Sequence, residues 1–309
     1  MSFHKDALRN AGEAAVNAIF LLQMVAGALG NAVLFSRGIS PVFLGHKQRP
    51  VQMVLPHLAL ANLLVLLSAG VPHTMAAFVS RRPLSSLGCK SVYYTQRAAR
   101  STVLCSTCVL STCQSFTLSP RRAEWVMLRG RAPRVTGASC WVCWMFSLLM
   151  NILVPLKITG PWDTHNSTDT WGKWFCSPLA SKTGFVYLWS FSDAVFLTLM
   201  GWSSGSMVLL LLRHRQRMQH IHTRNGHHRW PPETRAAHTV LMLVVTFIIF
   251  YVLNSTFCFY ITVVLEFRLW LIQTSDVLAS CFPTVSPFLL LLRDPRTPRI
   301  CSGADRNNA

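Results

Sequence analysis

The chain has 309 residues, of which 51% are hydrophobic and only 13% are charged, with a formal net charge of +18. Soluble globular domains carry about 25% charged residues, so this composition argues against a soluble protein and for a membrane protein. The basic excess does not indicate nucleic acid binding. The Lys and Arg residues stand in short stretches between long apolar segments, as in the cytoplasmic loops of membrane proteins.

Seven segments are long and apolar enough to cross a bilayer, which takes about 20 mostly apolar residues in a helix. In chain order the predicted spans are 14–36, 51–79, 89–118, 135–156, 184–212, 239–264 and 269–292. The third is the least apolar, because Lys90, Arg97 and Arg100 interrupt it. The pattern predicts an all-α membrane protein in which residues 1–309 form a single seven-transmembrane helix bundle.

The distribution of basic residues predicts how the bundle is oriented. With residues 1–13 outside, the cytoplasmic segments contain 18 Lys and Arg residues and the outer segments contain 9. The positive-inside rule therefore places the N-terminus outside and the short C-terminal tail, 293–309, in the cytoplasm. We expect a multi-pass protein of the plasma membrane, with the bilayer as its permanent partner.

Two features of the predicted loop between spans four and five agree with this orientation. Asn166 begins a glycosylation sequon, and glycans are added on the lumenal side. Cys89 stands at the outer end of span three and Cys176 in the same outer loop, so both would face an oxidising compartment in which a disulfide persists. A second sequon, at Asn254, lies inside span six and is interpreted as a chance match.

The cysteines inside apolar segments are interpreted as small packing residues. These are Cys105, Cys108, Cys113, Cys140, Cys143 and Cys258. Cys105-x-x-Cys108 and Cys140-x-x-Cys143 have the spacing of zinc half-sites, but the segments lack the turns that bring four ligands together. We expect no metal site and no cofactor. The sequence also contains no Gly-rich phosphate loop and no His-Glu-x-x-His motif, so we do not expect an enzyme.

Four charged residues within the predicted spans are candidates for a functional site, because a charge inside the membrane is costly. They are Arg97, Arg100, Asp193 and Asp276. At the rise of an α-helix, each lies about 10–16 Å from the outer end of its span. We expect them to face one central cavity, in which the arginines form a basic wall and the aspartates are partial counter-ions. The alternative is an ion-pair network that only locks helices together.

Local motifs then resemble those of rhodopsin-like receptors. Gly30 and Asn31 in span one, and Asn62 within Leu-Ala-Leu-Ala-Asn-Leu in span two, follow the general receptor pattern, although many such receptors have Asp in place of Asn62. The chain lacks Asp/Glu-Arg-Tyr after span three and Asn-Pro-x-x-Tyr in span seven. Span seven instead contains Cys-Phe-Pro-Thr-Val-Ser-Pro-Phe, with Pro283 and Pro287, which resembles the vomeronasal type-1 receptors.

Further stretches carry the same resemblance, which extends from residue 30 to residue 294. They include Met-Gly-Trp-Ser-Ser-Gly-Ser-Met-Val at 200–208 and the basic stretch at 213–222. The resemblance implies a pheromone or odorant-like receptor that binds a small molecule and activates a heterotrimeric G protein of the inhibitory class. It also makes Asn31, Asn62, Pro283 and Pro287 a helix-packing motif.

Residues at the inner ends of spans three and five, most of them basic, are candidates for contact with the G protein. They are Ser119, Pro120, Arg121, Arg122, Arg213, His214, Arg215 and Arg217. The same basic residues also set topology and attract anionic lipid headgroups, so the charge does not by itself identify a docking surface. Three alternatives to a signalling pheromone receptor stay open: a bitter-taste-like receptor, a transporter or channel, and a receptor relic that no longer signals.

Overall fold

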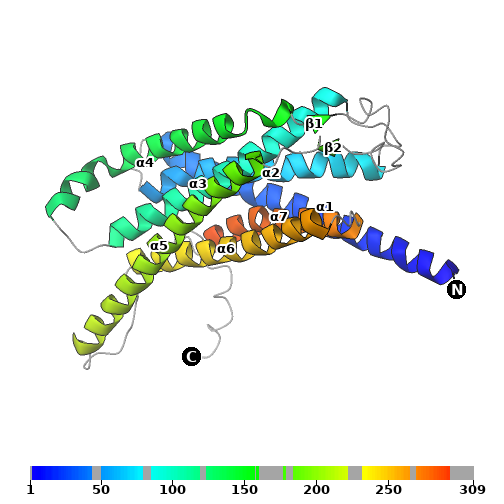
Figure 1. The fold of residues 1–309 in the computed structure, drawn as a ribbon. Coiled ribbons are helices and arrows are strands. Elements are labelled where there is room, and N and C mark those ends of the chain that lie inside the picture. Colours follow the sequence, from blue (N-terminus) through cyan, green and yellow to red (C-terminus); the bar gives the residue numbers. More distant parts are fainter. Residues whose placement is uncertain are drawn as a thin grey trace, which may run out of the picture.

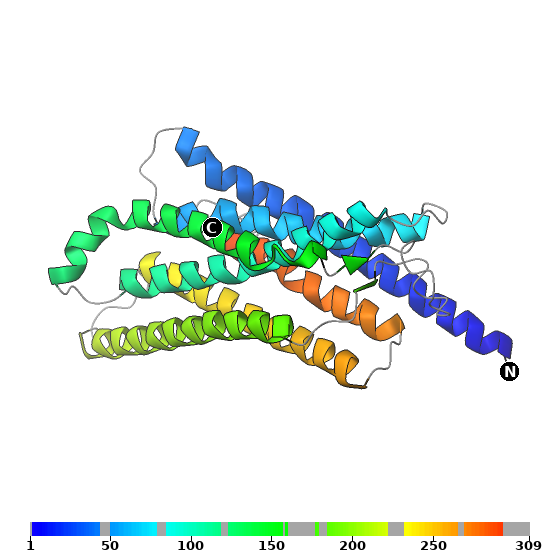
Figure 2. The same ribbon diagram turned by 45° about the horizontal axis from the view of Figure 1, so that its top comes forward.

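The computed structural model describes residues 2–43, 50–78, 85–118, 123–156, 158–159, 177–178, 184–221, 232–264 and 269–292. Seven α-helices account for almost all of this described part. Their bounds are α1 Ser2–Phe43, α2 Pro50–Phe78, α3 Ser86–Leu118, α4 Ala123–Met150, α5 Gly184–Ile221, α6 Pro232–Val264 and α7 Leu269–Leu292. The helices lie side by side along a common direction, and the first turns of α1 extend beyond the bundle (Figures 1 and 2).

The connection from α4 to α5 contains the other regular structure among the described residues. The 3-10 turn Val154–Leu156 follows α4 and leads into strand β1, Ile158–Thr159, which pairs antiparallel with β2, Ser177–Pro178. This two-stranded ribbon contacts α3 and lies at the same end of the bundle as the start of α1 (Figure 1). The connection between α4 and α5 therefore returns to α3.

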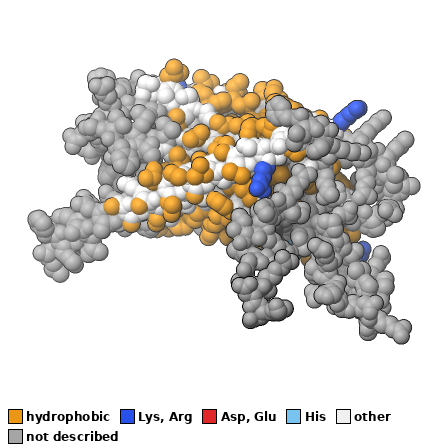
Figure 3. Space-filling view, turned by 180° about the vertical axis from the view of Figure 1, so that it is seen from behind, with side chains coloured by type: hydrophobic (Ala, Val, Ile, Leu, Met, Phe, Trp, Pro, Cys, Tyr) orange, Lys and Arg blue, Asp and Glu red, His pale blue; other side chains and the backbone are white. Residues whose placement is uncertain are grey.

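Six of the helices contain a segment long and apolar enough to cross a membrane. These segments are Ala14–Pro41, Pro50–Gly70, Arg134–Leu156, Ser190–Arg213, Ala237–Phe257 and Thr274–Leu292. Large apolar side chains such as Leu22, Trp141 and Trp202 are exposed on their outer faces, and hydrophobic side chains cover much of the described surface in Figure 3. Because such a surface is unfavourable in water and favourable in lipid, the described residues form a helical bundle suited to a bilayer.

The helix α3 is the exception to this apolar composition, and its position explains why. It contacts α2, α4, α5 and α6 and lies in the middle of the bundle, so that seven consecutive residues, 102–108, are buried. Two buried hydroxyl groups on α3 bond within the helix: Thr102 donates to the carbonyl of Ala98 at 2.9 Å and Thr107 to that of Val103 at 2.7 Å. A helix surrounded by protein needs fewer lipophilic side chains than one that faces lipid.

Buried polar side chains join α1, α2 and α7 at one place. We call this group of contacts the α1/α2/α7 junction. Asn31 and Asn62 are both fully buried. The Asn31 amide donates to the carbonyls of Gly27 and Pro283, each at 2.8 Å. The Asn62 amide donates to Asn31 Oδ1 at 3.1 Å and to Ser286 Oγ at 2.9 Å.

The prolines of α7 explain the contact between Asn31 and Pro283. Pro287 has no N–H, so the carbonyl four residues earlier, that of Pro283, loses its helical donor. The Asn31 amide supplies the missing hydrogen bond across the helix interface. Gly30 permits this approach, since an added Cβ would lie only 3.0 Å from Pro287 Cγ. The predicted packing residues Asn31, Asn62, Pro283 and Pro287 therefore lie in one region.

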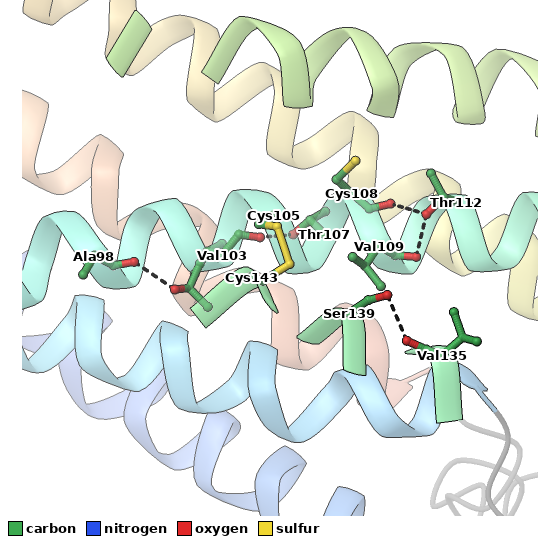
Figure 4. The surroundings of a disulfide bond; sticks show 11 residues. Ala98, Val103, Cys105, Thr107, Cys108, Val109, Thr112, Val135, Ser139 and Cys143 are labelled. Carbon is green, nitrogen blue, oxygen red and sulfur yellow. Dashed lines mark hydrogen bonds between the residues drawn. A yellow bond between two sulfur atoms is a disulfide. The ribbon is translucent and has the colours of Figure 1, made fainter. Parts of the chain in front are cut away.

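The interface between α3 and α4 contains a disulfide that the sequence interpretation missed. Cys105 and Cys143 are bonded, with their Cα atoms 5.7 Å apart (Figure 4). The interpretation of these two residues as packing cysteines was wrong, because antiparallel helices place them opposite one another in the interface. Cys108, Cys113, Cys140 and Cys281 are free thiols.

Candidate functional site

A cavity of about 840 Å³ lies inside the bundle, between α3, α5, α6 and α7. Val65 of α2, Met150 at the end of α4 and the following Asn151 also contribute to its wall. The volume falls in the range of pockets that hold small organic molecules.

Three of the four charged residues predicted within the membrane line this cavity. Arg97 and Arg100 lie on its α3 side and Asp193 on its α5 side. Asp276 of α7 is not among the lining residues, although it lies within electrostatic range of Arg100. The cavity wall thus carries two arginines and one aspartate.

The carboxylate of Asp193 is held by a residue of α6. The Tyr251 hydroxyl donates to Asp193 Oδ2 at 2.6 Å, which is at the short end of the range for O–H···O hydrogen bonds. The Tyr251 ring stacks on Phe247 with centroids 5.8 Å apart, and Phe247 meets the edge of Phe282 at 4.7 Å. Tyr251 therefore connects the charged part of the wall to an aromatic part.

The guanidinium of Arg100 is held by another residue of α6, Asn254. The side chain of Asn254 fits its surroundings with its amide oxygen towards Arg100 Nη2, at 2.7 Å, and its nitrogen towards the carbonyl and hydroxyl of Ser275, at 3.0 and 3.2 Å. Asn254 is only 4% exposed. One buried amide thus joins α3, α6 and α7 beside the cavity.

The α7 side of the cavity includes a residue whose backbone carbonyl has no N–H partner within the helix. Pro283 has no N–H, so the carbonyl of Ala279 lacks its donor within the helix. Ala279 and Pro283 both line the cavity. Ala279, Ser190 and Asn151 thus give the wall hydrogen-bonding groups in addition to the charges.

The sequence analysis missed Asn254 and gave Tyr251 no specific role. From the sequence, Asn254 was interpreted only as the start of a chance sequon, and Tyr251 was not among the candidate site residues. A polar side chain in the middle of an apolar segment was the available signal for both residues. The partner of each became visible only when the helices were placed against one another.

Several predicted site residues lie outside the described part of the structure. Cys89 is buried and disulfide-bonded, but its predicted partner Cys176 is not described, and neither is Asn166. Of the residues expected to face a G protein, Arg213 is exposed at the C-terminal end of the apolar segment of α5. The others lie outside the described residues or have undescribed side chains: Ser119, Pro120, Arg121, Arg122, His214, Arg215 and Arg217. Within the described residues, no three His, Cys, Asp or Glu side chains are grouped to hold a metal.

Comparison with known proteins gives the class of the molecule. Residues 14–303 match the model of the vomeronasal organ pheromone receptor family. The chain is 38% identical to vomeronasal type-1 receptor 2 of Homo sapiens over 292 residues, which cover 93% of this chain and 74% of that protein. It is 38% identical to human vomeronasal type-1 receptor 4 over 287 residues, covering 92% and 95% of the two chains.

A more distant relative comes from fish. The chain is 32% identical to olfactory receptor class A-like protein 1 of Danio rerio over 278 residues, covering 88% of this chain and 87% of that protein. All three relatives are named as receptors and none as an enzyme. The helical bundle and these matches define a multi-pass membrane receptor of the chemosensory G-protein-coupled class. The chain belongs to the vomeronasal organ pheromone receptor family.

Proposed function

We propose that this receptor binds a pheromone or odorant-like small molecule in the cavity between α3, α5, α6 and α7, and activates a heterotrimeric G protein of the inhibitory class. One observation carries the proposal: Arg97, Arg100 and Asp193, three charges from two helices, line a cavity of about 840 Å³. Charges inside a membrane protein are retained where they serve ligands, ions or partner charges. The aromatic group of Phe247 and Phe282 offers an apolar surface beside them.

The same proposal includes a topology. All seven helices cross the membrane, with the N-terminus outside, because basic residues concentrate at the opposite end. Cys89 then bonds Cys176 in the outer loop, and Asn166 carries a glycan. The disulfide of Cys89 and the return of the β1–β2 ribbon to α3 support this arrangement. The helix α3 crosses as the central helix of the bundle, where protein rather than lipid surrounds it.

On the inner side, we assign G-protein contact to the segment 119–122 and to the end of α5, with Arg213, His214, Arg215 and Arg217. The exposure of Arg213 and the basic charge of these segments support the assignment. Basic residues at this level also bind anionic headgroups. Replacing Arg213 and Arg217 with Gln separates the two roles, because lost G-protein activation at unchanged membrane insertion identifies a docking contact.

The test is G-protein activation in cells that display the receptor on their surface, against a panel of volatile, steroidal and acidic odorants. We expect a dose-dependent response that Arg97→Ala and Arg100→Ala each weaken at least about tenfold, since a charged hydrogen-bond partner is removed. Lys90→Ala is the matched control, because Lys90 lies on the same helix and does not line the cavity.

Each alternative has its own result. Silence across the panel despite good surface display would indicate a relic. Ion or solute flux without G-protein activation would indicate a transporter or channel. A response from a taste-type G protein to bitter compounds would favour a bitter-taste-like receptor. Loss of surface display in the Arg97 and Arg100 variants would show that these residues lock the helices together rather than bind the ligand.

A further inference from the structure

The partner of Arg100 distinguishes it from an arginine that only stabilises the bundle. Among the described side chains, its hydrogen-bond partner is the neutral amide of Asn254, at 2.7 Å. Among the described residues, neither Asp193 nor Asp276 forms a direct ion pair with Arg100, although Asp276 lies within electrostatic range of it. The Asp193 carboxylate accepts a hydrogen bond from the Tyr251 hydroxyl instead. An amide orients a guanidinium but leaves its charge in place, whereas a carboxylate would orient the guanidinium and also neutralise its charge.

The geometry of Asn254 makes it suited to fix an arginine. Its nitrogen is anchored to the carbonyl and hydroxyl of Ser275 on α7, so its oxygen is not free to turn away from Arg100. A guanidinium has five N–H donors in a rigid plane, and the contact with Asn254 uses one nitrogen. Because Arg100 lines the cavity, its other donors remain for a bound molecule.

We propose that Asn254 is a positioning residue that presents Arg100 to the cavity as an oriented cation without a directly bonded carboxylate, and that it thereby selects molecules with an acidic or strongly accepting oxygen group. This rests on the proposed function and specifies the ligand chemistry of the same site. The apparent sequon at 254–256 then has a structural meaning: the asparagine is needed for its amide. With Asp in its place, Arg100 would be paired and an acidic ligand would have to displace a carboxylate.

Binding of two matched probes to the purified full-length receptor in lipid nanodiscs tests this inference. The probes are 4-phenylbutyrate and 4-phenylbutyramide, which share an apolar body suited to the aromatic wall and differ in charge. Ligand-observed NMR, with empty nanodiscs subtracted, gives their affinities without any G protein. We expect the wild type to favour the acid by about tenfold, as a charge-assisted bond is stronger than a neutral one, and Arg100→Gln to lose this preference.

Variants of Asn254 separate positioning from folding. Asn254→Asp keeps an acceptor for Arg100 but loses the donor to the Ser275 carbonyl, and we expect it to remove the acid preference in the receptor that remains folded. Asn254→Ala reduces the preference about threefold or more through lost orientation, and it has no further effect when Arg100 is already Gln. Thr246→Val, on α6 with a bond only to its own helix carbonyl at Met242, is the control that keeps the preference.

The outcomes divide clearly. Unchanged acid preference in both Asn254 variants, with loss in Arg100→Gln, would overturn the role of Asn254 and leave the proposed site intact. Equal binding of the two probes to the wild type, or binding of neither, would overturn the inferred ligand chemistry. The proposed receptor function is judged separately by G-protein activation, which does not depend on these two probes.

Discussion

The α1/α2/α7 junction and the wall of the cavity both contain polar side chains that join helices. The polar groups are buried between helices in the junction, whereas charged groups face open space in the cavity. In the junction, Asn31 and Asn62 are fully buried, and their amides join three helices with no charged group among them. Beside the cavity, Asn254 and Tyr251 make comparable bonds, but their partners Arg100 and Asp193 are charged and line open space.

The difference shows how one residue type serves two purposes in a membrane bundle. A neutral polar network that is buried between helices holds them at fixed positions. A network that ends on charged groups at a cavity keeps donors and acceptors for another molecule. Changes in the junction should therefore affect stability first, and changes at the cavity should affect ligand response first.

The largest effect is expected from breaking the junction. Asn31→Leu leaves the Pro283 carbonyl and an Asn62 amide donor without partners in a buried site, which should cost about 4 kcal/mol of stability. Thermal unfolding of the purified receptor measures the loss. Thr198→Val is the control, because Thr198 is exposed and bonds only to its own helix. An Asn31→Leu receptor as stable as the control would contradict a structural role for the junction.

The next largest effect is expected from removing the disulfide between α3 and α4. Cys143→Ser removes a disulfide that closes a loop between residues 38 positions apart, and the expected loss is about 3 kcal/mol. Cys140→Ser on the same helix alters a free thiol and should change stability much less. Peptide mapping under non-reducing conditions should yield the Cys105–Cys143 pair. Recovery of both cysteines as free thiols would refute the disulfide.

A smaller and more selective effect is expected at the cavity. Tyr251→Phe removes the hydroxyl bonded to Asp193 and should weaken the response to an active odorant by about tenfold, equal to about 1.4 kcal/mol, with less effect on the melting temperature. Tyr260→Phe serves as the control, since Tyr260 is 48% exposed. A large loss of stability with unchanged potency would place Tyr251 with the structural residues of the junction.

The smallest effect concerns the hydroxyl contact between α3 and α5. Ser111 and Ser203 are buried with their oxygens 2.6 Å apart, so Ser111→Ala should cost about 1 kcal/mol, the value of one neutral hydrogen bond. Ser139→Ala, which removes only a bond to the Val135 carbonyl of its own helix, is the comparison. Equal melting temperatures for the two variants would show that the α3–α5 contact adds nothing to stability.

The cavity shows where sequence reasoning stopped. The cost of burying a charge identified Arg97, Arg100, Asp193 and Asp276 from the sequence, but it did not reveal that Asp276 is absent from the lining residues. It also gave no partner for Asn254. Depth along a helix follows from residue counting, whereas the direction of a side chain depends on how the helix is rotated in the bundle. In a membrane helix that is apolar on all faces, the sequence carries little information on that rotation.

The cysteines show the same limit. Two Cys-x-x-Cys pairs were visible in the sequence, and neither spacing distinguished packing from bonding, because a disulfide requires Cα atoms about 4.4–6.8 Å apart on different helices. Only the placement of α3 against α4 brought Cys105 and Cys143 together.

The sequence by itself determined that this is a multi-pass helical membrane receptor of the vomeronasal type-1 family, because bilayer thickness demands long apolar segments and the span-seven motif is local. The tertiary structure decided which polar groups meet. It brought the Asn31 amide to the Pro283 carbonyl, which lacks a helical donor because of Pro287, and the Asn254 side chain to Arg100. It also brought Cys105 and Cys143 close enough to form a disulfide. Such pairs lie far apart along the chain, and their distances are set by helix rotation and packing, which residue spacing within a helix does not specify.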